Sequence, residues 1–100
     1  MNSIRLSVVI CVYNEAENIE PLISKLRSVL REIDSEIIFV DDGSTDSTLE
    51  KLKQGAGPDI TVVEFRRNFG QSAALAAGIE YASGKWIATM DGDLQNDPED

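Results

Sequence analysis

Two aspartates separated by one glycine follow an apolar segment near the end of the sequence. Asp91-Gly92-Asp93 comes directly after Lys85–Met90, which has the length and composition of a strand. Carboxylate oxygens are ligands that Mg²⁺ or Mn²⁺ prefers, and such an ion keeps positions for water and substrate phosphates. The same three residues also suit a polar turn with glycine at a positive φ. The metal interpretation therefore depends on which other residues reach the same place.

Three earlier apolar runs also end in polar residues. The runs are Leu6–Val12, Glu36–Val40 and Ile60–Phe65, and β-branched or aromatic residues dominate them. The groups that follow them are Tyr13-Asn14-Glu15, Asp41-Asp42 and Arg66-Arg67. Ligands of open parallel sheets bind outside the carboxyl ends of the strands. We therefore expect these groups to converge with the two aspartates that follow the fourth strand.

Helical periodicity separates the strands. Apolar residues from Ile19 to Ile33 recur at three- and four-residue spacing, a second helix begins near 44–47, and an alanine-rich helix ends at Tyr81. The βαβαβαβ order with short loops predicts a parallel, Rossmann-like α/β sheet with helices on both faces. If the fourth strand returns beside the first, a crevice opens between Tyr13 and Asp91.

Capping residues predict where the helices begin. The first helix has two candidate caps, Asn14 and Asn18, and the sequence does not choose between them. For the second helix, Ser47 and Glu50 fit a capping box, and for the third helix Ser72 is the predicted cap.

Composition excludes several classes of function. The net charge of −9, from 9 basic and 18 acidic residues, argues against general binding to a phosphate backbone. Histidine is absent, which removes Ser-His and Cys-His nucleophilic pairs and His-ligated zinc. The single cysteine, Cys11, lies in an apolar run and is predicted to be a buried, reduced strand residue. No apolar run reaches the roughly 18 to 20 residues that span a bilayer. These features indicate a cytoplasmic chain.

The converging groups suit a nucleotide that carries a diphosphate. Tyr13 can stack on a base or sugar, while Glu15 and Asp42 can accept hydrogen bonds from ribose hydroxyls or base N–H groups. Arg66 or Arg67 can meet a phosphate. A metal held by Asp93 can neutralise charge as a nucleoside diphosphate departs.

Four segments together resemble a known family. They are Val12-Tyr13-Asn14-Glu15, Val40-Asp41-Asp42-Gly43-Ser44-Thr45-Asp46, Arg67-Asn68-Phe69-Gly70 and Asp91-Gly92-Asp93-Leu94-Gln95. In this order they resemble the family 2 glycosyltransferases of the GT-A fold, in particular the branch that acts on dolichyl or undecaprenyl phosphate. The resemblance runs over essentially the whole chain. It implies an inverting, metal-dependent transfer of sugar from a nucleotide diphosphate-sugar to a polyprenyl phosphate or other acceptor.

The resemblance also implies roles for individual residues. Tyr13, Glu15 and Asp42 would hold the nucleoside, with Arg66 or Arg67 near nucleotide or phosphate. Asp91 and Asp93 would be the catalytic aspartates. Asp91 would lie near ribose and diphosphate, and Asp93 with Gln95 would ligate Mg²⁺ or Mn²⁺. Two departures from the family pattern matter. Many relatives have proline at position 11, which affects the backbone before Tyr13. Relatives often read Asp-Leu-Gln-Asp-Pro-Pro-Glu where this chain has Asp93-Leu94-Gln95-Asn96-Asp97-Pro98-Glu99, which affects any metal role of position 96.

The organisation beyond these motifs gives further expectations. Asp97-Pro98 looks like the start of another helix. We therefore expect residues 1–100 to be the N-terminal donor-binding part of a larger domain, inactive in isolation. The acceptor site, contact with the cytoplasmic face of a membrane and any homo-oligomer would involve the whole protein.

Two other functions would use some of the same features. A non-catalytic nucleotide-sugar-binding module or regulatory subunit would use the same residues without transfer. A receiver-type phosphoacceptor domain is disfavoured, because its acidic pair should follow the first strand, where this chain has Tyr13-Asn14-Glu15.

Overall fold

Strands and helices alternate strictly along residues 4–91, the part of the chain that the computed structural model describes. The elements are β1 (Leu6–Val12), α1 (Ala16–Val29), β2 (Ser35–Asp41), α2 (Thr48–Gly55), β3 (Ile60–Glu64), α3 (Gln71–Tyr81) and β4 (Trp86–Asp91). The predicted βαβαβαβ order is confirmed. Asp93 and Gln95, the predicted metal ligands, lie outside the described residues.

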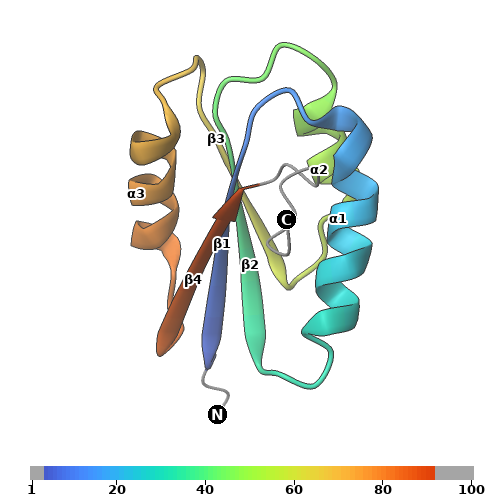
Figure 1. The fold of residues 1–100 in the computed structure, drawn as a ribbon, viewed down its shortest axis with the longest axis vertical. Helices are drawn as coiled ribbons and strands as arrows, with labels where there is room; N and C mark the ends of the chain where they lie inside the picture. Colours follow the sequence, from blue (N-terminus) through green and yellow to red (C-terminus); the bar gives the residue numbers. More distant parts are fainter. Residues whose placement is uncertain (1–3, 92–100) are drawn as a thin grey trace, which may run out of the picture.

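All four strands of this part are parallel, in the order β3-β2-β1-β4 (Figure 1). β1 lies in the middle, where Val12 is paired with Asp41 of β2 and Cys11 with Asp91 of β4. The fourth strand therefore returns beside the first, as predicted. This order places the carboxyl ends of β1 and β4 next to each other.

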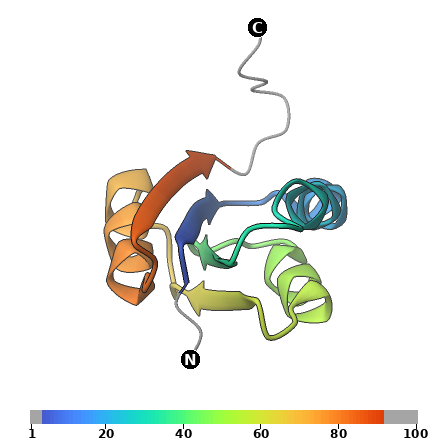
Figure 2. The ribbon, with the colours of Figure 1, turned by 90° about the horizontal axis from the view of Figure 1, so that it is seen from below.

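Helices cover both faces of the sheet, as predicted: α1 and α2 lie on one face and α3 on the other (Figure 2). Val8, Ile10 and Val12 of β1 point into the larger core, which they share with Phe39 and residues of α1. On the opposite face α3 approaches closely, because Gly78 has no side chain. A Cβ built there would lie 2.4 Å from Cγ1 of Val9.

The ends of several elements differ from the predictions. α1 ends at Val29, so Ile33 lies beyond it and is 43% exposed, although it continues the helical spacing. The chain must turn there to enter β2, and the N–H of Arg5 donates to the carbonyl of Asp34 in that turn. Cys11 is half-buried rather than buried, because residues 86–90 of the neighbouring β4 are exposed.

None of the predicted side-chain caps forms. Glu15, Ser47 and Gly70 occupy the N-cap positions of α1, α2 and α3, and none of them makes a side-chain capping hydrogen bond. Gly70, with a φ of 101°, is the N-cap of α3, so the helix begins at Gln71 and Ser72 lies inside its first turn. None of the helices in residues 4–91 is long and apolar enough to cross a membrane.

Candidate functional site

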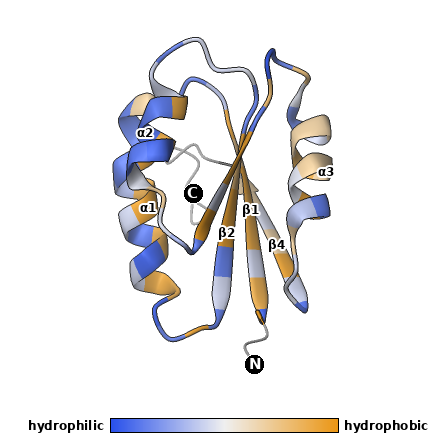
Figure 3. Ribbon diagram, turned by 180° about the vertical axis from the view of Figure 1, so that it is seen from behind, coloured by the Kyte–Doolittle hydropathy of each residue, from blue (hydrophilic) through white to orange (hydrophobic). Residues whose placement is uncertain are grey.

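Three loops follow β1, β2 and β3 at the same edge of the sheet (Figure 1). We call them loop 1 (residues 13–15), loop 2 (42–47) and loop 3 (65–70). Figure 3 shows that this edge is coloured largely blue and white, whereas the strands below it are mostly orange. The structure therefore brings Tyr13, Asp42 and the Arg66-Arg67 pair to one edge, as predicted, and the backbone of Asp91 ends β4 at that same edge.

Asn14 joins loop 1 to loop 2. Its φ of 52° is left-handed, a conformation that asparagine adopts more readily than most residues. Its side-chain Oδ1 accepts hydrogen bonds from the N–H groups of Thr45 (2.8 Å) and Asp46 (3.3 Å). Its own N–H donates to Oγ of Ser44 at 2.9 Å. Asn14 therefore orients the residues on either side of it, Tyr13 and Glu15, rather than capping α1.

Asp46 supplies the helix caps that the sequence patterns misplaced. Its Oδ1 accepts from the N–H and the hydroxyl of Thr48 at the start of α2. Its Oδ2 accepts from the N–H of Ala16 at the start of α1, at 3.4 Å. Burial alone would raise the pKa of Asp46, but the hydrogen bonds from Thr48 and Ala16 outweigh it, so the pKa is lowered. The sequence signal was only that Asp46 is one of several cap-type residues between Ser44 and Thr48.

Asp42 joins loop 2 to loop 3. Its side chain is buried, with 2% of the residue exposed. Oδ1 accepts from the N–H of Phe69 at 2.8 Å, and Oδ2 accepts from the N–H of Gly70 at 3.1 Å. The Nδ2 group of Asn68 donates back to the carbonyl of Asp42 at 3.2 Å. The neighbouring Asp41 is equally buried, and its Oδ1 accepts from the N–H of Ser44. The carboxylates of both Asp41 and Asp42 therefore accept hydrogen bonds from backbone N–H groups of the loops.

Gly43 makes the close approach of loops 2 and 3 possible. Its φ is 77°, a conformation that side chains with a Cβ rarely adopt. A Cβ at this position would lie 2.2 Å from the carbonyl carbon of Arg67 and 2.4 Å from the nitrogen of Asn68. Loop 3 therefore rests with its backbone directly on Gly43.

Aromatic and cationic side chains are among the exposed groups at this edge. Tyr13 is 42% exposed and Phe69 is 53% exposed. The guanidinium carbon of Arg67 lies 4.8 Å from the centre of the Phe69 ring. That ring meets Phe65 edge to face, with 5.4 Å between the ring centres. Arg66 is exposed and has no ion pair with a described residue.

Glu15 lies where loop 1 enters α1 and is half-buried. Its Oε1 accepts from Nδ2 of Asn18 at 2.8 Å, and its N–H donates to Oγ1 of Thr48 at 2.8 Å. The carboxylate keeps further acceptor positions, since an ionised carboxylate has about four. Beside Tyr13, it can accept hydrogen bonds from hydroxyl groups of a ligand.

The described residues do not form a metal site by themselves. Within residues 4–91, no group of three Asp, Glu, His or Cys side chains could hold an ion. Of the two predicted catalytic aspartates, Asp91 and Asp93, the structure describes only the backbone of Asp91, which is paired with Cys11 at the end of β4. The assignment of the ion to Asp93 and Gln95 stays a prediction.

The sequence matches the model of glycosyl transferase family 2 over residues 7–100. It is 45% identical over 105 residues to the dodecaprenyl-phosphate galacturonate synthase of Rhizobium johnstonii, covering 100% of this chain and 31% of that protein. It is 43% identical over 101 residues to the undecaprenyl-phosphate 4-deoxy-4-formamido-L-arabinose transferase of Salmonella choleraesuis, covering 96% of this chain and 31% of that protein. The chain thus spans about a third of the length of these relatives.

Solved structures share the arrangement of the sheet and helices. The mannosyltransferase PcManGT of Pyrobaculum calidifontis, in complex with GDP-Man and Mn²⁺, superposes with a TM-score of 0.75 and 30% identity over 93% of this chain and 28% of that one. The glucosyl-3-phosphoglycerate synthase of Mycobacterium tuberculosis, in complex with Mn²⁺, UDP and glucosyl-3-phosphoglycerate, gives 0.72 and 28% identity over 89% and 33%. These neighbours confirm the predicted α/β fold of the GT-A type. The chain belongs to glycosyl transferase family 2.

Proposed function

We propose that residues 1–100 are the donor-binding part of a glycosyltransferase that moves a sugar from a nucleotide diphosphate-sugar to a polyprenyl phosphate. The proposal rests on the convergence of Tyr13, Glu15 and the basic loop 3 at the carboxyl edge of the sheet. Two observations support it. The relatives from Rhizobium and Salmonella are named for transfer to dodecaprenyl or undecaprenyl phosphate. The structural neighbours were solved with GDP-Man or UDP.

The exposed groups have complementary tasks in this proposal. Tyr13 stacks on the base or sugar, and Glu15 accepts hydrogen bonds from ribose hydroxyls. Asp91, at the end of the adjacent strand, lies near the ribose and diphosphate. Arg66 or Arg67 supplies a cation from loop 3, and Asp42 belongs to the same end of the site, beneath that loop.

The predicted ligands Asp93 and Gln95 would hold Mg²⁺ or Mn²⁺, which neutralises the negative charge of the departing diphosphate. The donor set suits such an ion, since carboxylate and amide oxygens are hard ligands. An acceptor phosphate oxygen is already nucleophilic, so an inverting displacement needs no strong base among the described residues. Because a polyprenyl phosphate is a membrane lipid, transfer would take place at the membrane surface, which we place at its cytoplasmic face.

The test is a transfer assay on the full-length protein with nucleotide sugar, polyprenyl phosphate and Mg²⁺ or Mn²⁺, read as radiolabelled glycolipid. We expect glycolipid to form, and Asp93→Asn to abolish metal-dependent donor binding. Residues 1–100 alone should not turn over. Donor binding without glycolipid for any nucleotide sugar would instead identify a non-catalytic binding module.

Tyr13 provides a sharper check on the donor site. Aromatic stacking on a base is worth about 1–3 kcal/mol. Tyr13→Ala should therefore weaken nucleotide binding about 5- to 100-fold in a calorimetric titration. Tyr13→Phe, the matched control, keeps the ring and should bind within about 2-fold of the original protein. Equal losses in both variants would show that the hydroxyl, not stacking, matters.

A further inference from the structure

We propose that the outer edge of β4 is an interface at which a second copy of this chain adds its own β4, antiparallel, around a two-fold axis at Ala88. This inference goes beyond the proposed function and does not depend on it, because the strands can pair without any nucleotide. Three features of β4 support it: its open edge, the direction of its backbone groups and the order of its side chains.

β4 is the least covered strand of the described sheet. It lies at one end of the order β3-β2-β1-β4, so within residues 4–91 no strand pairs with its outer edge (Figure 1). Every residue from Trp86 to Met90 is exposed, Trp86 by 63%. The helices leave the strand open as well. α3 packs chiefly against β1 and β2, and the core beneath α1 and α2 includes no side chain from residues 86–90.

The other edge of the sheet is built differently. β3 has five residues, of which only Thr61 and the charged Glu64 are exposed. Edge strands that stay unpaired are typically short or carry charges, proline or a bulge. β4 has six residues in regular register with β1, and its segment from Trp86 to Met90 contains no charge, proline or glycine. An exposed apolar edge of this kind favours pairing with another strand.

The backbone groups of β4 point alternately toward β1 and away from it. The N–H of Trp86 donates to the carbonyl of Arg5 at 2.8 Å, so the even-numbered residues of β4 face β1. Ile87 and Thr89 therefore direct their N–H and C=O groups to the open edge. Two such residues exchange a pair of hydrogen bonds when they lie opposite each other in antiparallel strands. Pairing Ile87 with Thr89 of the second copy, on both sides of the axis, forms four hydrogen bonds.

This register also suits the side chains. It places Ala88 opposite itself on the axis, Trp86 opposite Met90, and the oppositely charged Lys85 and Asp91 at opposite positions. Directly opposite residues have Cβ atoms about 4.5–5.5 Å apart, which brings a tryptophan ring and a methionine sulfur into contact. A shift of two residues in either direction keeps the hydrogen-bond pattern but separates Lys85 from Asp91. The charges therefore select the register centred on Ala88.

Pairing around a two-fold axis closes on itself. Both copies use the same patch, so the product is a dimer and not a longer assembly. The joined sheet has the order β3-β2-β1-β4-β4-β1-β2-β3. Because the two β4 strands run in opposite directions, the carboxyl edges of the two copies lie at opposite ends of this sheet. The two candidate sites are therefore kept apart.

The first test measures the oligomeric state of residues 1–100 by analytical ultracentrifugation over a range of concentrations, without nucleotide. We expect a dimer. Emission from Trp86, the only tryptophan, should move to shorter wavelength as the dimer forms, because the partner covers its ring. A folded chain that stays monomeric up to about 1 mM, the range of very weak affinities, would overturn the proposal. Another part of a longer protein would then be the better candidate to cover β4.

The second test asks whether the axis lies at Ala88. Ala88→Lys and Ala88→Glu each set like charges opposite each other, so each variant alone should dimerise at least about 5-fold more weakly than the original chain. An equal mixture of the two should recover the dimer, because opposite charges then meet. Ala88 is exposed, so neither change disturbs the core. Thr61→Lys, on the exposed side of β3, is the matched control and should leave dimerisation within about 2-fold. Undiminished dimers of both Ala88 variants, or no recovery on mixing, would overturn the proposal.

Amide hydrogen exchange checks the backbone pairing in the unaltered chain. The N–H groups of Ile87 and Thr89 should exchange more slowly at concentrations where the dimer forms than where the monomer prevails. Nuclear magnetic resonance spectra resolve the two amides. Exchange that stays the same while a dimer forms would show that the copies meet at another surface, and would overturn the proposal.

Discussion

At the amino edge of the sheet Glu36 accepts hydrogen bonds from Ser7 and Ser83, and at the carboxyl edge Asp42 accepts them from Phe69 and Gly70. In both places a carboxylate at one end of β2 accepts hydrogen bonds from the backbone of a segment that borders α3. Glu36 Oε2 receives the hydroxyl of Ser7 at 2.6 Å and the N–H of Ser83 at 2.7 Å. The same interaction, a carboxylate that accepts backbone N–H groups from a distant segment, is therefore present at both edges.

The difference lies in what the held segment carries. Around Glu36 the segment is a tight turn, in which the N–H of Gly84 donates to Oγ of Ser7, and a Cβ on Gly84 would lie 2.7 Å from that oxygen. Around Asp42 the segment is loop 3, which presents an exposed aromatic ring and a cation. The same kind of hydrogen bond closes the fold at one edge and fixes candidate ligand-binding side chains at the other.

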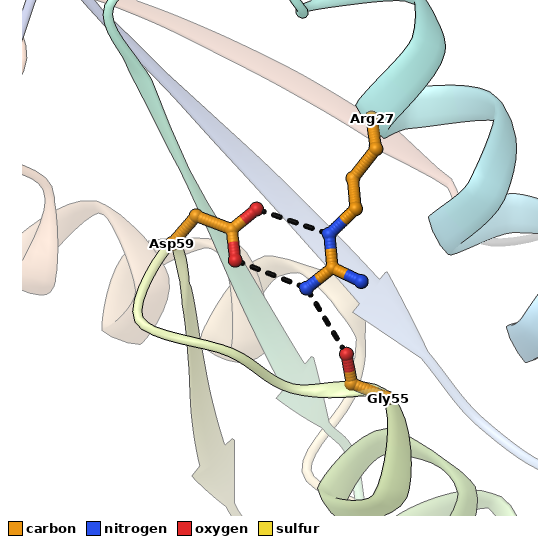
Figure 4. A network of polar contacts seen from close by, with 3 residues as sticks. All are labelled: Arg27, Gly55 and Asp59. Carbon is orange, nitrogen blue, oxygen red and sulfur yellow. Dashed lines mark hydrogen bonds and ion pairs between the residues drawn. The ribbon is translucent and has the colours of Figure 1, made fainter.

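The amino side also has a more exposed contact between crossovers (Figure 4). Arg27 of α1 makes a two-pronged contact with Asp59, at 3.1 Å from Nε and 3.0 Å from Nη2, and Nη2 also donates to the carbonyl of Gly55. Both charged side chains are more than 40% exposed. Solvent weakens such a pair, so we expect it to stabilise the fold far less than the buried contacts of loop 2.

The largest predicted effect is at Gly43, where the carboxyl edge depends on close backbone contact. Gly43→Ala should destabilise the protein by more than about 3 kcal/mol, because the new Cβ collides with Arg67 and Asn68 and the φ is unfavourable. Gly70→Ala is the matched control, since its φ is also positive but nothing lies within 4 Å of a Cβ there. It should cost only about 1–3 kcal/mol. Chemical denaturation measures both, and similar costs would show that steric contact at Gly43 is unimportant.

The next largest effect concerns Asp46, whose carboxylate accepts hydrogen bonds from the first residues of both α1 and α2 at the carboxyl edge. Asp46→Ala should lower the free energy of unfolding by about 2 kcal/mol at neutral pH, the upper end for loss of a cap. Ser47→Ala should change it by less than about 0.5 kcal/mol, because Ser47 occupies the N-cap position of α2 without a side-chain capping bond. Thermal unfolding of the two variants compares them, and a larger loss for Ser47→Ala would contradict this assignment.

Glu36 makes the amino edge sensitive to acid. Burial would raise its pKa, but the hydrogen bonds from Ser7 and Ser83 outweigh this, and its pKa in the fold lies below the ordinary value. The ionised form therefore stabilises the fold above the unfolded pKa, and this contribution is lost as pH falls through the folded pKa. Glu36→Gln should cost about 1 kcal/mol at pH 7. In urea titrations the difference from the original protein should shrink as pH falls below the ordinary pKa of a glutamate, about 4.3, and should vanish once Glu36 is protonated in the fold. A difference that does not change with pH would rule out this ionisation as its source.

The smallest effect is expected for the exposed pair of Figure 4. Arg27 holds the pKa of Asp59 below its ordinary value, chiefly through their hydrogen bonds. Because both groups are well exposed, Asp59→Asn should cost about 0.5 kcal/mol, and less at high salt. Urea denaturation at low and high salt measures this. A loss above about 2 kcal/mol would mean that the amino edge depends on this pair as strongly as the carboxyl edge depends on Asp46.

Local patterns in the sequence were enough for the architecture. The β-branched run Leu6–Val12 and its counterparts have strand length, and helical spacing lies between them, so a parallel sheet with two covered faces follows from general packing rules. Because the strands are parallel, those rules also place the carboxyl ends of all of them at one edge of the sheet. The meeting of Tyr13, Asp42 and the two arginines was therefore predictable without coordinates.

Only the tertiary structure decided which polar residue does what at that edge. Asn14 accepts from Thr45, 31 residues away, and Asp42 accepts from Phe69, 27 residues away, and no local pattern contains such pairings. Several neighbouring residues in loop 2 had equal capping chemistry, and only the position of α1 beside α2 selected Asp46. Residue types thus determined that a polar site would form, whereas long-range packing determined which of its carboxylates support loops and which remain available for a ligand.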